Sequence, residues 1–157
     1  MADIQTTHTY VTPGGTIVFN NGSLGDGTDK FWIHGLPGLD GPDVRAPIDD
    51  VPFGDGSLLH RFWLTGCKFA VEGVFIIETV PYNSTGCQAA INAMEAALKA
   101  AVKSNVAASG SWSFTPTGQG AISLTVFHPG QPKLDITPIE NFATRSFTFG
   151  LISATAL

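Results

Sequence analysis

One uninterrupted segment stands out in a chain that glycine and proline otherwise divide. The 157 residues include 18 glycines and 10 prolines, yet none falls between residues 88 and 103, where alanine dominates. The larger apolar residues of this segment recur at spacings of three and four: Ile91, Met94, Leu98 and Val102. This spacing predicts a single α-helix, at about residues 86–104, with an apolar stripe that packs on the core.

The ends and surface of this helix carry further signals. Thr85 is followed three residues later by a glutamine, the spacing of a capping box, so we expect Thr85 to be the N-cap. Glu95 precedes Lys99 by four residues, which is the favourable order for an ion pair on a helix surface. Exposed alanines beside the stripe would also admit a partner helix or a neighbouring subunit, as the less favoured alternative to core packing.

The rest of the chain is typical of short strands separated by turns. Seven or eight strands are expected, at residues 16–19, 31–34, 62–64, 68–80, 111–115, 121–128, 134–137 and 145–153. With only one helix of crossover length, a parallel α/β sheet is disfavoured. The expected fold class is mainly β: an antiparallel β-sandwich or a small split barrel with one helix, forming one domain over residues 1–157.

Charge is scarce and unevenly placed. Charged residues make up 13% of the chain, about half of the ~25% typical of soluble domains. Lys30 and Arg45 are the only bases in a stretch that contains seven acids: Asp26, Asp29, Asp40, Asp43, Asp49, Asp50 and Asp55. This stretch accounts for the whole formal net charge of −5. The balance disfavours specific nucleic-acid binding, which normally requires a basic surface, and no apolar run approaches the ~18 residues of a membrane helix.

The acidic stretch includes the least regular part of the sequence, residues 36–57. Five glycines and four prolines lie in or directly beside it. An irregular segment of about 20 residues in a compact domain is usually functional or ordered by a partner. Its aspartates are either solvated turn residues or an acidic surface that repels polyanions and docks basic partners.

Motifs for catalysis, metals and cofactors are missing from the sequence. There is no nucleophile elbow, no phosphate-binding loop and no dinucleotide fingerprint. Four isolated histidines are expected in turns or on the surface rather than as metal ligands: His8, His34, His60 and His128. The pair Asp49-Asp50 is expected to face water, although it could support acid–base or cation chemistry. We therefore expect no catalytic residue, no metal and no cofactor.

Tryptophan and cysteine also have structural interpretations. Trp32 and Trp112 alternate with polar neighbours in expected strands and are predicted in the core, although with Trp63 they could form a sugar-stacking platform. Cys67 and Cys87 do not make a disulfide framework, and no signal-peptide pattern is seen, so we expect reduced thiols. Cys87 is predicted in the first turn of the helix.

The order of several motifs carries more information than any one of them. The run Gly38-Leu39-Asp40-Gly41-Pro42-Asp43-Val44-Arg45 is followed by an Asp-, Pro- and Gly-rich turn at 49–56. Strands with Phe62-Trp63 and Phe69-Ala70-Val71-Glu72-Gly73 come next, and then the alanine-rich helix. In this order the chain resembles the N-terminal region of siphophage distal tail proteins, in detail over about residues 30–105 and in outline beyond.

The resemblance implies a structural virion protein of the phage tail tip, made in the host cytoplasm and without enzymatic activity. Such N-terminal domains form a ring, typically hexameric, between the tail-tube protein and the tail-tip or baseplate proteins, and genome DNA passes through the channel without specific binding. Many members add a C-terminal carbohydrate-binding domain, which we do not expect here. A pure adaptor role follows.

Within such a ring, the acidic segment would contact the adjacent subunit or face the channel. The residues expected there are Asp40, Asp43, Arg45, Asp49, Asp50 and Asp55, with Arg45 in an ion pair between subunits. A tail-tube or tail-terminator protein is the first alternative, with an exposed hairpin at 68–80 building the tube wall. A carbohydrate-binding module and an enzyme of unrecognised type are the others.

Overall fold

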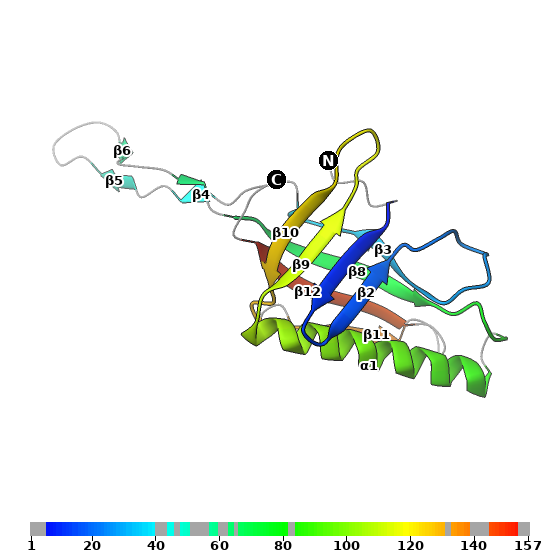
Figure 1. Ribbon diagram of the computed structural model, residues 1–157. Helices are drawn as coiled ribbons and strands as arrows, with labels where there is room; N and C mark the ends of the chain where they lie inside the picture. Colours follow the sequence, from blue (N-terminus) through cyan, green and yellow to red (C-terminus); the bar gives the residue numbers. More distant parts are fainter. Residues whose placement is uncertain are drawn as a thin grey trace.

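A computed structural model of the chain describes residues 6–39, 44–45, 48–50, 57–59, 63–64, 66–81, 84–130, 133–138 and 145–153. Seven strands form a closed barrel in the order β10-β9-β1-β2-β3-β8-β12, in which β12 returns to pair with β10 (Figure 1). An eighth strand, β11, extends the sheet beside β12. The strands are β1 (His8–Thr12), β2 (Gly15–Phe19), β3 (Lys30–Gly35), β8 (Lys68–Ile76), β9 (Gly110–Phe114), β10 (Ile122–Phe127), β11 (Asp135–Pro138) and β12 (Arg145–Ser153).

Four further strands make two short antiparallel pairs outside this sheet. They are β4 (Val44–Arg45) with β7 (Trp63–Leu64), and β5 (Ile48–Asp50) with β6 (Ser57–Leu59). The prediction of a mainly β chain with one helix is confirmed. Pairing is antiparallel, as expected, except between β2 and β3, which are parallel.

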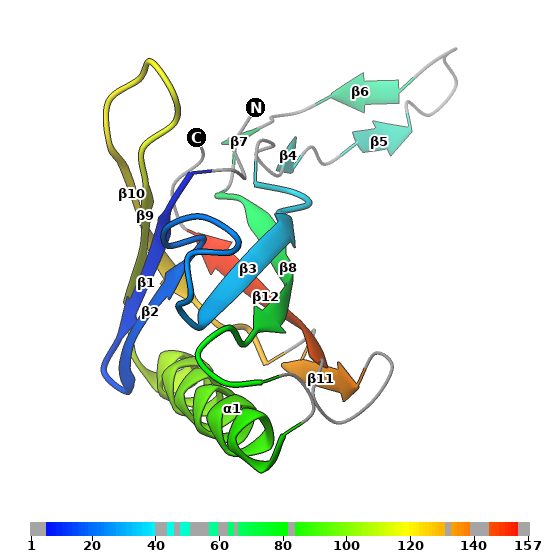
Figure 2. The ribbon, with the colours of Figure 1, turned by 90° about the vertical axis from the view of Figure 1, so that its right-hand side faces the viewer.

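The helix α1 (Thr85–Ala107) lies across one end of the barrel (Figure 2). Its predicted apolar stripe is confirmed, because Ile91, Leu98 and Val102 are buried and Met94 packs against the core. The predicted N-cap was wrong by one residue. Ser84 takes that position, since its hydroxyl accepts a hydrogen bond from the Cys87 amide at 3.1 Å.

Aromatic side chains fill the barrel. Trp112 is fully buried, as predicted, and its ring centroid lies 5.3 Å from that of Phe19 and 5.9 Å from that of Tyr10. The strand expected at 145–153 is confirmed as β12, and its Phe147 and Phe149 are buried beside this group. Contacts of this kind bury ~150–250 Å² per aromatic side chain and dominate core energetics.

Three predictions about single residues were wrong. Trp32 is only half-buried, because its strand turns that side chain away from the barrel interior. His8 is fully buried and stacks on Phe114, with ring centroids 4.8 Å apart. His128 is buried as well, and its Nδ1 lies 2.8 Å from the carbonyl oxygen of Gly150.

Buried polar groups fix the last turn of α1 to the barrel. The Asn105 side chain accepts a hydrogen bond from the Tyr10 hydroxyl at 2.8 Å. It donates to the carbonyls of Ala108 at 2.9 Å and Val126 at 3.0 Å. One fully buried amide therefore links the helix to β1 and β10. Burial also raises the pKa of Tyr10 well above its ordinary value.

An ion-pair group joins the middle of α1 to β12. Lys99 donates to Glu95 at 2.5 Å, which confirms the predicted helical pair, and Arg145 binds the other oxygen of the same carboxylate. These two cations hold the pKa of Glu95 below its usual range, with the Lys99 hydrogen bond the largest cause.

Among the described residues, no helix is long and apolar enough to cross a membrane.

Candidate assembly surfaces

The segment expected to be irregular contains short strands. Arg45 lies in β4 opposite Trp63, and Asp49 and Asp50 lie in β5 opposite Leu58 and Ser57. β4 pairs with β7, and β5 pairs with β6, which lie between them in the sequence. This is the connectivity of one long hairpin with two paired sections. Both views show the pairs away from the barrel (Figures 1 and 2). We call these four strands the arm.

The arm holds three of the six residues expected at an interface. Arg45, Asp49 and Asp50 belong to it, whereas Asp40, Asp43 and Asp55 lie outside the described residues. The expected ion pair of Arg45 with an aspartate of another subunit stays a prediction. The strand expected at residues 62–64 is confirmed as β7. The sequence did not indicate β4, β5 and β6, because each has only two or three residues in a segment rich in proline and glycine.

Two acids of the same stretch have a different role. Asp26 accepts hydrogen bonds from Lys30 at 2.5 Å and from the Thr28 hydroxyl at 2.6 Å, within the loop between β2 and β3. The Lys30 contact is the largest cause that holds the pKa of Asp26 far below its usual range. Asp29 accepts hydrogen bonds from the Glu78 and Thr79 amides at 2.8 and 3.1 Å. These carboxylates are bound within the subunit.

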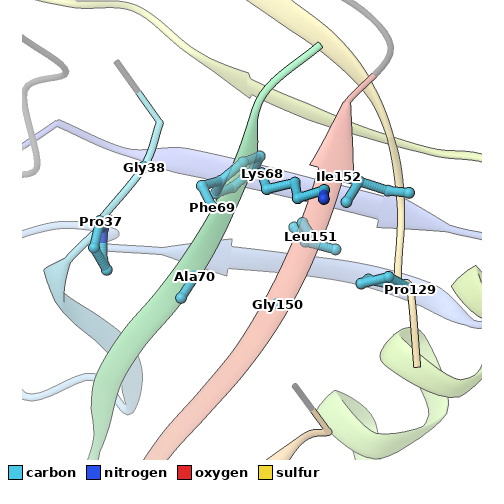
Figure 3. A pocket seen from close by; sticks show the side chains of 9 residues that line it. All are labelled: Pro37, Gly38, Lys68, Phe69, Ala70, Pro129, Gly150, Leu151 and Ile152. Carbon is cyan, nitrogen blue, oxygen red and sulfur yellow. The ribbon is translucent and has the colours of Figure 1, made fainter. Parts of the chain in front are cut away.

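An apolar groove of about 520 Å³ crosses the start of β8 and the end of β12 (Figure 3). Ala70 and Gly150 are paired directly across the two strands, and their small size hollows the surface. Pro37 borders the groove beyond β8 and Pro129 beyond β12. Lys68 provides the one charged side chain among its lining residues. This groove had no signal in the sequence, because its lining comes from four separate segments.

The outer face of β2, β1, β9 and β10 has no charged residue in its two central rows. Cross-strand partners place these side chains in register: Val18, Thr9, Ser113 and Ser123 in one row, and Thr16, Val11, Ser111 and Thr125 in the other. All eight are exposed or half-buried. The face therefore presents hydroxyl and valine side chains, and a neighbouring surface could approach it without desolvating a charge.

The possible metal ligands of the described residues are dispersed. No group of three or more His, Cys, Asp or Glu residues among the described residues could hold a metal ion. Cys67 and Cys87 are both buried, and neither is in a disulfide bond. The arrangement is that of a barrel with one helix, an arm and two uncharged or apolar outer surfaces.

The chain is similar in fold to a phage protein of known structure. It is similar to the Dit protein of phage SPP1, with a TM-score of 0.59 and 10% sequence identity. The similarity covers 93% of this chain and 49% of that chain, so this chain spans about half the length of the SPP1 protein. That structure is described as a paradigm of the hub of the adsorption apparatus in phages that infect Gram-positive bacteria. At this identity the similarity shows a Dit-like fold.

No protein-family model matches the sequence, and no curated relative does either.

Proposed function

We propose that this chain is a structural subunit of a phage tail, which assembles into a ring, most simply a hexamer, and joins the tail tube to the tail tip. The observation that carries the proposal is the Dit-like fold over 93% of the chain. The order of sequence motifs from residue 38 to the helix supports it independently, because it resembles the same class. Tail-tube proteins on one side and tail-tip or baseplate proteins on the other would be the partners, with DNA passing unbound through the channel.

Each subunit of a ring needs two different surfaces, one for each neighbour. The arm is one candidate, with Arg45, Asp49 and Asp50 at the contact or facing the channel. The uncharged face of β2, β1, β9 and β10 is the other candidate. Burying that face would cost less desolvation energy than burying a charged surface, because it carries hydroxyl groups and valines rather than ions. The low charge of the chain would then reflect the burial of this face between neighbouring subunits.

The test is assembly of the purified chain and of the Arg45→Glu variant. Mass photometry and negative-stain imaging should find closed rings for the wild type and mostly single subunits for the variant. Lys103→Glu is the matched control, because it makes the same charge reversal on the exposed surface of α1. A wild type that stays monomeric at micromolar concentration contradicts the ring. Normal rings from Arg45→Glu contradict the role of Arg45 and leave the ring intact.

A tail-tube protein is the second candidate, and one observation bears on it. The hairpin expected at 68–80 is instead a single strand, β8, between β3 and β12 in the barrel, while the arm is the exposed hairpin-like element. Imaging separates the two functions, since a tube protein stacks into long tubes and a hub forms single rings. A carbohydrate module would require glycan binding that disappears in Trp63→Ala.

A further inference from the structure

The barrel is joined by two narrow seams. Between β2 and β3 the ladder has one residue pair, Phe19 opposite Phe31, and the two strands are parallel. Between β10 and β12 it has two pairs. The β8–β12 ladder, in contrast, has seven pairs, from Ser146–Val74 to Ile152–Lys68. Strand separation that breaks the fewest backbone hydrogen bonds would therefore occur at the β2–β3 seam.

Two hydrogen bonds of Asn20, one from its backbone and one from its side chain, also join the strands at that seam. Asn20 follows β2 directly and has a positive φ of 55°, a conformation that asparagine tolerates better than most residues. Its backbone N–H donates to the Phe31 carbonyl at 2.9 Å, and its side-chain Oδ1 accepts a hydrogen bond from the Ile33 backbone amide at 2.7 Å. Asn20 is only 2% exposed. The seam thus depends on two hydrogen bonds of one buried residue.

The loop that follows, residues 21–29, folds around a buried ammonium group. Lys30 is 2% exposed, and its Nζ donates to the Ser23 carbonyl at 2.7 Å and to Asp26 at 2.5 Å. The Glu78 carboxylate lies 3.6 Å from the same nitrogen. A lysine is almost never fully buried unless it is paired, because the desolvation of its charge is costly. Lys30 therefore stays inside only while these acceptors surround it.

Glu78 also holds the loop from the other side. Its two carboxylate oxygens accept the amides of Gly25 at 2.8 Å and Gly27 at 2.9 Å. These hydrogen bonds hold the pKa of Glu78 below its usual range, with the Gly25 amide the largest cause. Glu78 lies just after β8, and β8 pairs with the edge of β3 opposite to β2. The hydrogen bonds of Glu78 therefore connect the loop to β8.

We propose that Lys30 and the loop 21–29 form a latch, and that the barrel opens locally between β2 and β3 when the latch is released. Opening breaks one ladder pair and the Asn20 hydrogen bonds, while the long ladders on either side stay intact. The ammonium group of Lys30 regains its water in the open state, which offsets part of the lost contacts. The barrel then opens locally at the β2–β3 seam, and the ion pairs of Lys30 determine how often it opens.

Amide hydrogen exchange of the full chain, measured by NMR, tests the latch. In the wild type, the Ile33 amide should exchange faster than the slowest amides of β12, because it exchanges from a locally open state. Glu78→Gln keeps the size of the side chain and removes its charge. This variant should raise the exchange rate of Ile33 by about tenfold or more while the slowest β12 amides change less than about twofold.

Glu95→Gln is the matched control, because it makes the same change at an ion pair on α1, away from the seam. It should leave the Ile33 rate, relative to that of β12, unchanged. Asp26→Asn, which removes the other carboxylate partner of Lys30, gives a second measurement should Glu78→Gln fold poorly, with the same expectation. Exchange of Ile33 at the rate of the slowest β12 amides, in the wild type and in these variants, would overturn the proposal.

Discussion

Replacing Gly73 by alanine adds one methyl group where β3 and β12 approach β8 from both sides. A Cβ at Gly73 would lie 3.0 Å from the carbonyl carbon of Trp32, closer still to its oxygen, and 2.5 Å from Cζ of Phe147. The Phe147 ring is fully enclosed by other aromatic rings, and the Trp32 carbonyl belongs to the β3 backbone. Neither neighbour can move without disturbing a strand ladder or the core.

The expected magnitude follows from two opposing effects. At an unobstructed strand position, alanine is favoured over glycine by roughly 0.5–1 kcal/mol, because glycine loses more backbone entropy on folding. Overpacking in a rigid core costs about 1–3 kcal/mol and occasionally more. Because a backbone carbonyl lies on one side of Gly73 and a buried ring on the other, we expect an overpacking cost at the upper end of this range. We expect a net loss of about 2–3 kcal/mol from the free energy of unfolding.

Urea denaturation followed by tryptophan fluorescence measures this loss. With a slope of ~1–3 kcal/mol per molar urea, the midpoint should fall by roughly 0.7–3 M. Gly120→Ala is the matched control, because a Cβ there meets no atom within 4 Å, and it should be neutral or slightly stabilising. A Gly73→Ala protein within about 0.5 kcal/mol of the wild type would refute the packing argument.

Three further predictions concern a buried amide, the half-buried Glu95 and the two thiols. Asn105→Ala removes the acceptor of the Tyr10 hydroxyl and should cost about 2–3 kcal/mol in urea unfolding, more than Tyr10→Phe at about 1–2 kcal/mol. The pKa of Glu95 is lower in the folded state, so its contribution to stability is present above the ordinary value of 4.5 and is lost as the pH falls below it. The free energy of unfolding of Glu95→Gln should therefore decrease less between about pH 5 and pH 3 than that of the wild type. Cys67 and Cys87 are buried, so a thiol reagent should modify both only after unfolding; rapid modification of the native chain would contradict their burial.

Periodic patterns in the sequence predicted the parts of the fold that they describe locally. The stripe on α1 and the strands β10 and β12 each depend on the spacing of neighbouring residues, and the structure contains these elements as expected. β1 was missed, because its apolar face consists of His8 and Tyr10 flanked by threonines, a pattern that does not resemble a core strand. Residues that act through distant partners, such as Asn20 and Lys30, were missed for a related reason. Their roles depend on which strands meet, which no local pattern records.

The acidic stretch is better understood as two separate groups. Asp26 and Asp29 are bound within the β2–β3 loop and do not contribute a free acidic surface. The remaining five acids lie between residues 40 and 55, where Arg45 is the only base, so the negative charge is concentrated in and beside the arm. Two arms brought face to face would therefore repel each other. An arm that does bind another copy must meet a different part of its surface, and contacts between unlike surfaces are those that generate rings.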